Sequence, residues 1–387
     1  MDLRLGVAAA ATDEERAAIA SVLGPAETGW DGGQRTAADG HAAYGGHAAR
    51  SRRHLLLPVL HAVQERIGWI SPGALDHLCA RLTIPPAEAY GVASFYALFR
   101  TTQSPSAVVH VCDDLACRVN GAEQVCQEME RRFGAEGIAG GSGGPSPGGS
   151  TEAGSNGADV AWLRSPCLGQ CDQGSAAIIQ HAGAEPARAG LAPFNPAQVR
   201  PALTPTEPGE PVPPLVPQTA GDRSSLRLLR RVGRVDPGSL DSYRAEGGYE
   251  MLRRAVAAGP QGVIRELTDA KLLGRGGAAF PIAIKWEAVA TSPIRPHYVV
   301  CNADESEPGT FKDRVLMEED PYALLEALTI MGNCCGAEQG YIYIRGEYPL
   351  AESRLVHAVG QARARGFLGP DVMGEGFAFD IEVRRGA

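Results

Sequence analysis

The chain has 387 residues, of which 44% are hydrophobic and 21% charged, with a formal net charge of −9. This length allows two or three packed cores, so we expect more than one domain. The acidic balance, without a basic stripe, argues against nucleic acid as a partner. No apolar run approaches the roughly 20 residues that cross a bilayer, and no leader sequence begins the chain. We therefore expect no membrane span and a cytoplasmic protein.

Residues 1–50 form a predicted N-terminal arm, rich in alanine and glycine. Its one helical signal is the capping-box spacing of Thr12 and Glu15, and we assign the arm no chemistry. Three helices are expected next, where apolar residues recur at helical spacing and where N-cap residues precede proline. They lie over residues 51–67, Pro72–Leu82 and Pro85–Leu98.

Short apolar runs bounded by turn residues then predict three strands of a small sheet, over Ala107–Val111, Asp159–Leu163 and Ala176–Ile179. Between the first two strands, a tract from Gly134 to Gly157 has too little apolar surface to offset the entropy of ordering, which predicts a surface insertion. Residues 181–220 contain ten prolines in forty, which indicates a linker. We expect a first domain over residues 51–180, a linker over 181–223 and an α/β domain over 224–387.

Nine cysteines in a chain without an export signal suggest metal binding or redox work more than structural disulfides. Cys112 and Cys117 follow one predicted strand, and Cys167 and Cys171 follow another. A [2Fe-2S] cluster needs four thiolates, and two strand-end loops can supply two each. Zinc also accepts four thiolates, and unrelated structural cysteines are a third reading. Disulfide exchange of the thioredoxin type needs Cys-x-x-Cys, which is absent.

The motif residues around these cysteines resemble the E subunit of bacterial NADH-quinone oxidoreductase over about residues 51–180. The likeness rests on Cys112-Asp-Asp-Leu-Ala-Cys117, on Cys167-Leu-Gly-Gln-Cys171 and on the preceding Tyr90-Gly-Val-Ala-Ser-Phe-Tyr96. It implies a thioredoxin-like fold in which the four cysteines hold a [2Fe-2S] cluster. The glycine-rich tract makes the gap between Cys117 and Cys167 longer than is usual in that family.

A glycine loop, Gly274-Arg-Gly-Gly-Ala-Ala279, fits the dinucleotide pattern Gly-x-Gly-x-x-Gly/Ala. That pattern requires a preceding strand, whereas residues 263–273 read as a helix and its end, so a Rossmann turn is not expected. Glycines let backbone N–H groups approach a phosphate or a flavin, and Arg275 and Lys285 add positive charge. For the glycines alone, a surface turn after a helix is the simpler reading.

An acidic segment, Cys301-Asn-Ala-Asp-Glu-Ser-Glu-Pro-Gly-Thr-Phe-Lys-Asp-Arg314, follows the apolar run that begins at Tyr298. This order places polar groups at a strand end, where ligands of α/β sheets commonly bind. By composition alone, a solvated acidic turn is the simpler explanation of the segment.

Three ordered motifs together resemble the F subunit of the same oxidoreductase: the glycine loop through Pro281 with Lys285-Trp286, the acidic segment, and Tyr341-Ile-Tyr-Ile-Arg-Gly-Glu-Tyr348. Ala279 stands where that family usually has glycine. The resemblance implies that Phe280 and Glu307 receive NADH. It implies FMN binding by Gly274, Arg275, Gly276, Lys285, Asn302, Asp304 and Glu305. Five other cysteines match no cluster ligand and are expected to be buried small residues: Cys79, Cys126, Cys301, Cys334 and Cys335.

Fusion of an E-like part to an F-like part resembles the diaphorase subunit of NAD-linked hydrogenases. This implies an NADH:acceptor oxidoreductase that passes electrons from NADH through FMN to iron–sulfur clusters, without a side chain acting as acid or base. Its partners would be other subunits of a hydrogenase, a formate dehydrogenase or a quinone-reducing complex. A different class of function is a non-catalytic iron–sulfur relay or assembly subunit that does not bind NADH.

The resembling family continues beyond the final segment, Phe379–Ala387, into another flavin-contacting motif and a cysteine-rich region that carries a [4Fe-4S] cluster. We therefore expect the flavin domain to be incomplete and a [4Fe-4S] cluster only in a missing C-terminal part. On this reading, the 387-residue chain alone keeps the [2Fe-2S] cluster but binds FMN weakly.

Overall fold

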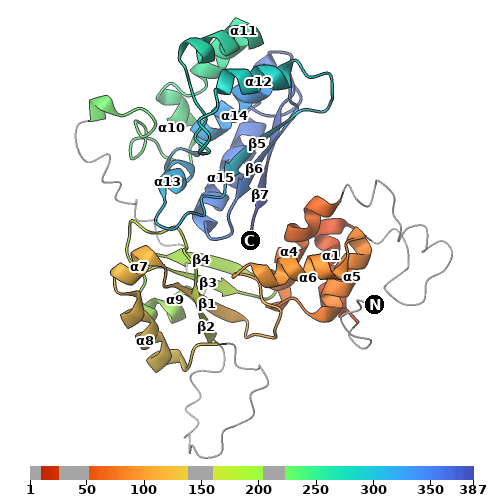
Figure 1. The fold of residues 1–387 in the computed structure, drawn as a ribbon, viewed down its shortest axis with the longest axis vertical. Helices are drawn as coiled ribbons and strands as arrows, with labels where there is room; N and C mark the ends of the chain where they lie inside the picture. Colours follow the sequence, from red (N-terminus) through yellow and green to blue (C-terminus); the bar gives the residue numbers. More distant parts are fainter. Residues whose placement is uncertain (1–9, 26–51, 138–159, 204–222) are drawn as a thin grey trace, which may run out of the picture. The chain divides into compact units, whose positions relative to one another are not determined.

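The computed structural model describes residues 10–25, 52–137, 160–203 and 223–387 (Figure 1). Most of the predicted N-terminal arm, nearly all of the predicted glycine-rich insertion and the later part of the predicted linker lie outside these residues. The chain forms two compact units, the first of residues 1–209 with 306–310 and 387, and the second of residues 210–305 and 311–386. The predicted combination of helices and strands is confirmed. Within the described residues, no helix has the length and apolar character needed to cross a membrane.

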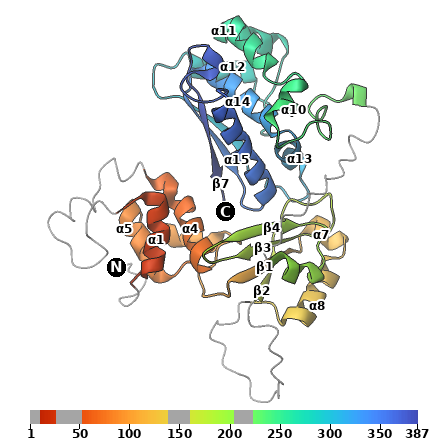
Figure 2. The same cartoon turned by 180° about the vertical axis from the view of Figure 1, so that it is seen from behind.

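The first unit begins with a group of helices: α1 (Asp13–Leu23), α4 (Leu56–Ile67), α5 (Pro72–Leu82) and α6 (Pro86–Phe95), with a short 3-10 helix, η1 (Arg53–Leu55), before α4. All three predicted helices are present, and α5 has the predicted bounds. Figure 2 shows α1 beside α4 and α5, and Ile19 of α1 is fully buried among their side chains. The helical signal predicted at Thr12 is therefore confirmed, and α1 packs into the helical group of the first unit.

Side-chain caps fix where these helices start. The Thr12 hydroxyl accepts from the Glu15 N–H at 3.2 Å, and the Glu15 carboxylate accepts from the Thr12 N–H at 2.7 Å, which confirms the predicted capping box. The Ser71 hydroxyl accepts from the Ala74 N–H at 3.0 Å and caps α5, whose first residue is Pro72. Local sequence thus sets the helix boundaries, and packing between helices supplies the burial.

A four-stranded sheet completes the first unit, in the order β2-β1-β3-β4. Its strands are β1 (Ala107–Cys112), β2 (Val160–Ser165), β3 (Ala177–His181) and β4 (Ala187–Leu191). β1 and β2 are parallel, whereas β3 is antiparallel to both β1 and β4. The remaining elements of the unit are α7 (Leu115–Val119), α8 (Ala122–Phe133), η2 (Pro196–Gln198) and α9 (Val199–Leu203).

The two faces of this sheet differ in character. Val109 and Val111 of β1 pack with Met129 of α8 and Val199 of α9 in one apolar core. The opposite face carries His110 and Cys112, because side chains alternate along a strand. One face of β1 thus anchors the unit, and the other carries chemically active side chains.

The first half of the predicted linker is in fact part of the sheet domain. Residues 187–191 form β4, which pairs with β3, and Phe194 and Val199 are buried in the core of the sheet. The sheet domain therefore extends past the predicted end at residue 180. Proline density misled the prediction because Pro186, Pro193 and Pro196 flank these elements and do not interrupt them.

The second unit is an α/β domain, as predicted, with three parallel strands in the order β5-β6-β7. Its elements in chain order are η4 (Arg223–Ser225), α10 (Leu240–Ala245), α11 (Glu250–Asp269), α12 (Ile282–Ala290), β5 (Tyr298–Ala303), α13 (Lys312–Glu319), α14 (Pro321–Cys335), β6 (Gln339–Ile344), α15 (Pro349–Ala364), η5 (Val372–Gly374) and β7 (Asp380–Arg385). The helix α14 contacts β5, β6, α11, α12 and α15, so it lies at the centre of the unit.

A buried carboxylate and a tight glycine contact hold α14 in place. Glu326 accepts hydrogen bonds from the Tyr249 N–H at 2.8 Å, the Leu252 N–H at 3.0 Å and the Tyr243 hydroxyl at 2.5 Å. These bonds satisfy N–H groups at the start of α11, where a helix lacks internal partners. On another side of α14, Gly332 lies so close to the Phe379 ring that a Cβ atom there would overlap it.

We predict that Gly332→Ala lowers the free energy of unfolding by about 1–3 kcal/mol, because overpacking the core outweighs the gain in helix propensity. Gly360→Ala is the matched control: Gly360 is an exposed residue in α15 with nothing near its Cβ position, so alanine should stabilise by about 0.5–1 kcal/mol. Chemical denaturation of the two variants measures whether each substitution lowers or raises the free energy of unfolding. Equal effects would show that the Phe379 contact is not tight.

Candidate functional site

The four predicted cluster cysteines meet at one edge of the first sheet. β1 and β2 are parallel neighbours with Cys112 in register with Ser165, so the loops that follow both strands leave from the same edge. Cys112 ends β1 and Cys117 lies in α7, while Cys167 and Cys171 follow β2. The 49 residues between Cys117 and Cys167 thus separate two pairs that lie together in space.

The sulfur atoms of these cysteines contact one another. The Cys112 thiol hydrogen-bonds with those of Cys117 and Cys167, and the Sγ atoms of Cys167 and Cys171 are 3.3 Å apart. Three of the side chains are buried, and Cys171 is partly exposed. The four thiols form two pairs, one from each loop, joined through Cys112 and Cys167. This donor set fits a cluster in which each of two irons takes two thiolates.

Burial and mutual hydrogen bonding control the protonation of these thiols. Hydrogen bonding with Cys117, followed by burial, raises the pKa of Cys112 to about 11, and the same bond lowers the pKa of Cys117. Hydrogen bonding with Cys112 and burial raise the pKa of Cys167 to about 12, and burial raises the pKa of Cys171 to about 11. Metal ligands must be thiolates, so loading this site releases protons.

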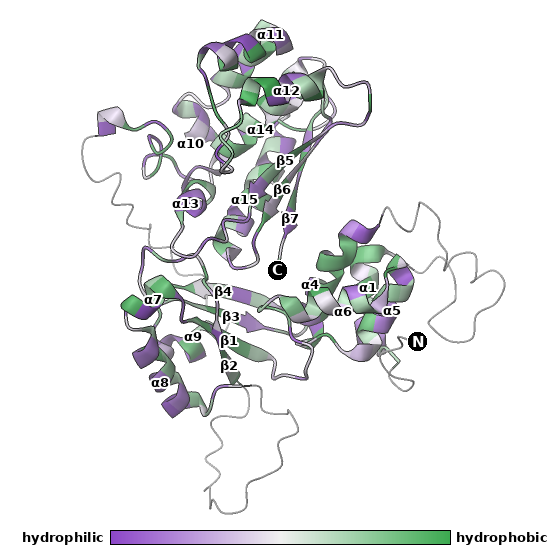
Figure 3. Ribbon diagram, viewed as in Figure 1, coloured by the Kyte–Doolittle hydropathy of each residue, from purple (hydrophilic) through white to green (hydrophobic). Residues whose placement is uncertain are grey.

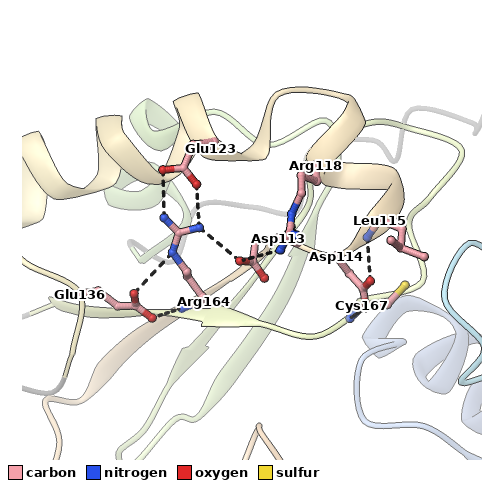
Figure 4. Close-up of polar contacts among 8 residues, drawn as sticks. All are labelled: Asp113, Asp114, Leu115, Arg118, Glu123, Glu136, Arg164 and Cys167. Carbon is pink, nitrogen blue, oxygen red and sulfur yellow. Dashed lines mark hydrogen bonds and ion pairs between the residues drawn. The ribbon is translucent and has the colours of Figure 1, made fainter.

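Asp114 connects the two cysteine loops, a role that the sequence analysis missed. Figure 4 shows its carboxylate bonded to both loops: Oδ1 accepts from the Leu115 N–H at 2.7 Å, and Oδ2 accepts from the Cys167 N–H at 3.1 Å. One oxygen caps α7 and the other fixes the backbone of the second cysteine pair. The only sequence signal for this role is an acidic residue at an N-cap position directly after a strand.

An arginine cluster braces the same edge (Figure 4). Arg164 of β2 lies 3.2 Å from Asp113, 3.0 Å from Glu123 and 3.5 Å from Glu136. Hydrogen bonding to Glu123 is the main cause that raises the pKa of Arg164, so the guanidinium stays charged. The cluster ties the end of β1 to α8 and β2, which holds the cysteine loops on a rigid frame.

In the second unit, the predicted glycine loop is a closed turn between α11 and α12. The Gly274 N–H donates to the Phe280 carbonyl at 2.8 Å, and Leu273 forms a bridge with Pro281. A helix precedes the loop, as predicted, so it is not a Rossmann turn. Ala279 has a φ of 50°, a left-handed conformation that glycine adopts at lower cost. The loop keeps its turn although alanine stands in place of the expected glycine.

Positive and apolar groups are exposed around this turn. Arg275 and Lys285 are both exposed, and within the described chain neither has an ion-pair partner. Phe280 is 52% exposed and Ile284 is 55% exposed, and α12 begins with the hydrophobic residues that are green in Figure 3. Unpaired cations beside exposed apolar groups fit a cofactor that has a phosphate and a flat ring.

The acidic segment begins at the carboxyl end of β5, as predicted. Asn302 and Glu307 are exposed, Asp304 is partly buried, and the Asp304 N–H donates to the Asn302 side chain at 3.2 Å. β5 and α12 both pack on α14, so the same helix supports the glycine loop and the acidic segment. Asn302 also lines a cavity of about 420 Å³ with Arg227 and Arg230, within the usual size range of ligand pockets.

The Glu305 side chain is bonded within the protein, and its role toward FMN stays a prediction. Its carboxylate is buried and accepts from the N–H groups of Asp313 at 2.6 Å and Arg314 at 2.9 Å, and from the Tyr348 hydroxyl at 3.0 Å. The Arg345 guanidinium donates to the Glu305 carbonyl at 2.8 Å. These bonds occupy the side chain that the resemblance assigns to FMN. Glu305 caps α13 and shapes the acidic segment, which sequence reasoning did not foresee.

The remaining cysteines agree with their predicted character in four cases. Cys79, Cys126, Cys334 and Cys335 are buried, whereas Cys301 is partly exposed. Burial raises the pKa of Cys79 to about 12 and the pKa of Cys126 to about 11, which keeps both thiols protonated. Cys79 packs among the helices of the first unit and Cys126 in the core of the sheet, so both act as small apolar residues.

Comparison with known proteins places both units in families. The thioredoxin-like [2Fe-2S] ferredoxin family matches residues 43–189, and the Nuo51 FMN-binding domain matches residues 267–387. The F 2 subunit of the NADH-quinone oxidoreductase of Rhizobium meliloti is 45% identical over 41% of this chain and 38% of its own length. The NAD-reducing hydrogenase HoxS subunit alpha of Cupriavidus necator is 31% identical over 87% of this chain and 53% of its own length.

A solved structure shares the fold. An NAD⁺-reducing [NiFe]-hydrogenase chain in the H₂-reduced state matches 86% of this chain and 51% of its own, at 23% identity and a TM-score of 0.60. The matched parts cover between 38% and 53% of the length of these relatives. The two domain matches lie in the order predicted from the motifs. The chain therefore contains a thioredoxin-like [2Fe-2S] ferredoxin domain followed by a Nuo51 FMN-binding domain, and it is similar to an F subunit of NADH-quinone oxidoreductase and to the alpha subunit of an NAD-reducing hydrogenase.

Proposed function

We propose that this chain takes electrons from NADH at a bound FMN and delivers them to iron–sulfur clusters, as a diaphorase component of a larger oxidoreductase. The observation that carries the proposal is the contact of four cysteine thiols in two pairs, in a chain that also has an FMN-binding domain. Bound FMN can accept two electrons as hydride and release them one at a time.

The residues of the first unit would bind and insulate the cluster. Cys112, Cys117, Cys167 and Cys171 provide thiolates, and three of the four are buried from water. The Gly169 N–H donates to the Cys167 sulfur at 3.4 Å, which stabilises negative charge on that ligand. Asp114 holds both loops in position. The chain thus supplies four thiolate ligands at fixed positions, and most of them are shielded from water.

In the second unit, we assign Arg275 and Lys285 to the cofactor phosphate, because both are exposed cations beside the glycine turn. Gly274 and Gly276 would let the backbone approach, and Asn302 and Asp304 would hydrogen-bond the polar edge of the cofactor. Phe280 offers a face on which a nicotinamide ring can stack, and Glu307 offers an acceptor for its ribose. Glu305 supports this site indirectly, through α13.

The partners that we propose are other subunits of an NAD-linked oxidoreductase, whether a hydrogenase, a formate dehydrogenase or a quinone-reducing complex. The names of the relatives support the first and the last of these. Leu115 and Val119 of α7 also support a docked partner, since they are 66% and 88% exposed on either side of Cys117. Reduced thiols of this kind favour the cytoplasm as the compartment.

We predict that Cys117→Ser removes or strongly weakens the visible and electron paramagnetic resonance signals of the cluster, because a hydroxyl is a poor iron ligand. Cys126→Ala is the matched control, since Cys126 is buried in the same unit but packs in the apolar core. It should keep the full signal. Loss of the signal in both variants, with both proteins folded, would contradict the ligand assignment.

In the full-length subunit, we predict that Lys285→Ala lowers the ratio of FMN to protein, because it removes a cation from the phosphate site, while Glu307→Gln retains the flavin and weakens NADH-dependent dye reduction roughly tenfold or more. Flavin absorbance after gel filtration and steady-state kinetics measure the two effects. If both substitutions released FMN to the same extent, the separate roles would be wrong. If the unmodified protein bound flavin but never reacted with NADH, the non-catalytic relay would be the better function.

A further inference from the structure

Arg100 is a buried cation on the face of the sheet that carries Cys112. It lies between α6 and β1 and is 4% exposed. Its Nε donates to the Gly68 carbonyl at 2.9 Å and to the Ser104 hydroxyl at 3.0 Å, and its Nη1 donates to the Gln180 side chain at 2.5 Å. The guanidinium is thus held by fixed bonds from both the helices and the sheet.

The charge of Arg100 is not neutralised by a carboxylate. Within the described residues it forms no ion pair, and its side chain donates only to neutral groups. Glu65 lines a small cavity next to it, but Glu65 lies 3.9 Å from Arg188, which also lines that cavity. Burial lowers the pKa of Arg100 only to about 10, so the group remains charged at neutral pH. An unpaired buried charge costs stability, and its field is weakly screened.

The field of Arg100 reaches the cluster site along β1. The Nη1 atom lies 3.4 Å from the ring Nε2 of His110, and Cys112 is two residues further along the same face of the strand. Two residues span about 7 Å of strand. A hydrogen bond also joins Cys112 to the segment that leads to Gln180. The Cys112 N–H donates to the Ala176 carbonyl at 2.9 Å, and Ala176 precedes Gln180 by four residues. His110 and its pairing partner on β3, Ile178, are both buried, so little solvent screens this path.

We propose that Arg100 raises the reduction potential of the [2Fe-2S] cluster on Cys112, Cys117, Cys167 and Cys171, an inference that rests on the proposed cluster. Reduction adds one electron, and therefore one negative charge, to the cluster. A fixed positive charge nearby in a weakly polar interior stabilises the reduced form more than the oxidised form. Arg100 thus acts on the cluster through its electrostatic field, without touching it, and makes the cluster a better electron acceptor.

The test is a redox titration of the full chain, purified anaerobically and followed by the electron paramagnetic resonance signal of the reduced cluster. Arg100→Gln removes the charge and should shift the midpoint potential to a more negative value. Arg100→Lys keeps the charge and should restore most of the original potential. Gln180→Glu keeps the guanidinium but cancels its charge, and should also shift the potential down, which decides the matter if Arg100→Gln does not fold.

Arg131→Gln provides the matched control, because it removes the same charge from an exposed position on α8, where the Arg131 side chain is 66% exposed. Its midpoint should equal that of the unmodified chain, since solvent screens an exposed charge. With iron and sulfide content intact, an unchanged midpoint in both Arg100→Gln and Gln180→Glu would overturn this inference alone. Absence of any cluster in the unmodified chain would instead overturn the proposed function, and the inference with it.

Discussion

The parallel pairing of β1 with β2 is the constraint on which the first unit depends. Parallel strands end at the same edge, so the loops after Cys112 and Ser165 must leave the sheet side by side. The cysteine pairs meet for this reason, although a long stretch of sequence separates them. Asp114 then joins the loops directly, and Arg164 ties the strand ends to α8. Loss of this register would separate the pairs whatever their local sequence.

The same principle orders the second unit, where β5, β6 and β7 are all parallel. The segments after β5 and β6 leave from one edge, and Arg345 and Tyr348 after β6 hold Glu305 after β5. Arg345 donates to the Glu305 backbone, whereas Tyr348 donates to its carboxylate. The acidic segment is therefore shaped by its neighbour strand and by α13. Its exposed residues, Asn302 and Glu307, remain available to a ligand.

Local sequence predicts much of this architecture, and the features that it did not predict have physical causes. Proline and N-cap residues predicted α5 with its observed bounds, because caps act within one turn. The strand β4 was missed because Ala187–Leu191 has little apolar alternation; as an edge strand, it depends on its ladder with β3. The bonds of Glu305 and the burial of Arg100 link positions that are far apart in sequence, so no local pattern indicates them.

The most direct test of the central claim, that paired thiols from two parallel strands hold a binuclear iron cluster, is elemental analysis of the anaerobically purified full chain. We expect iron and acid-labile sulfide in equal amounts, about two of each per chain. About one zinc per chain, with neither iron nor sulfide, would contradict it and would make the four cysteines a structural zinc site.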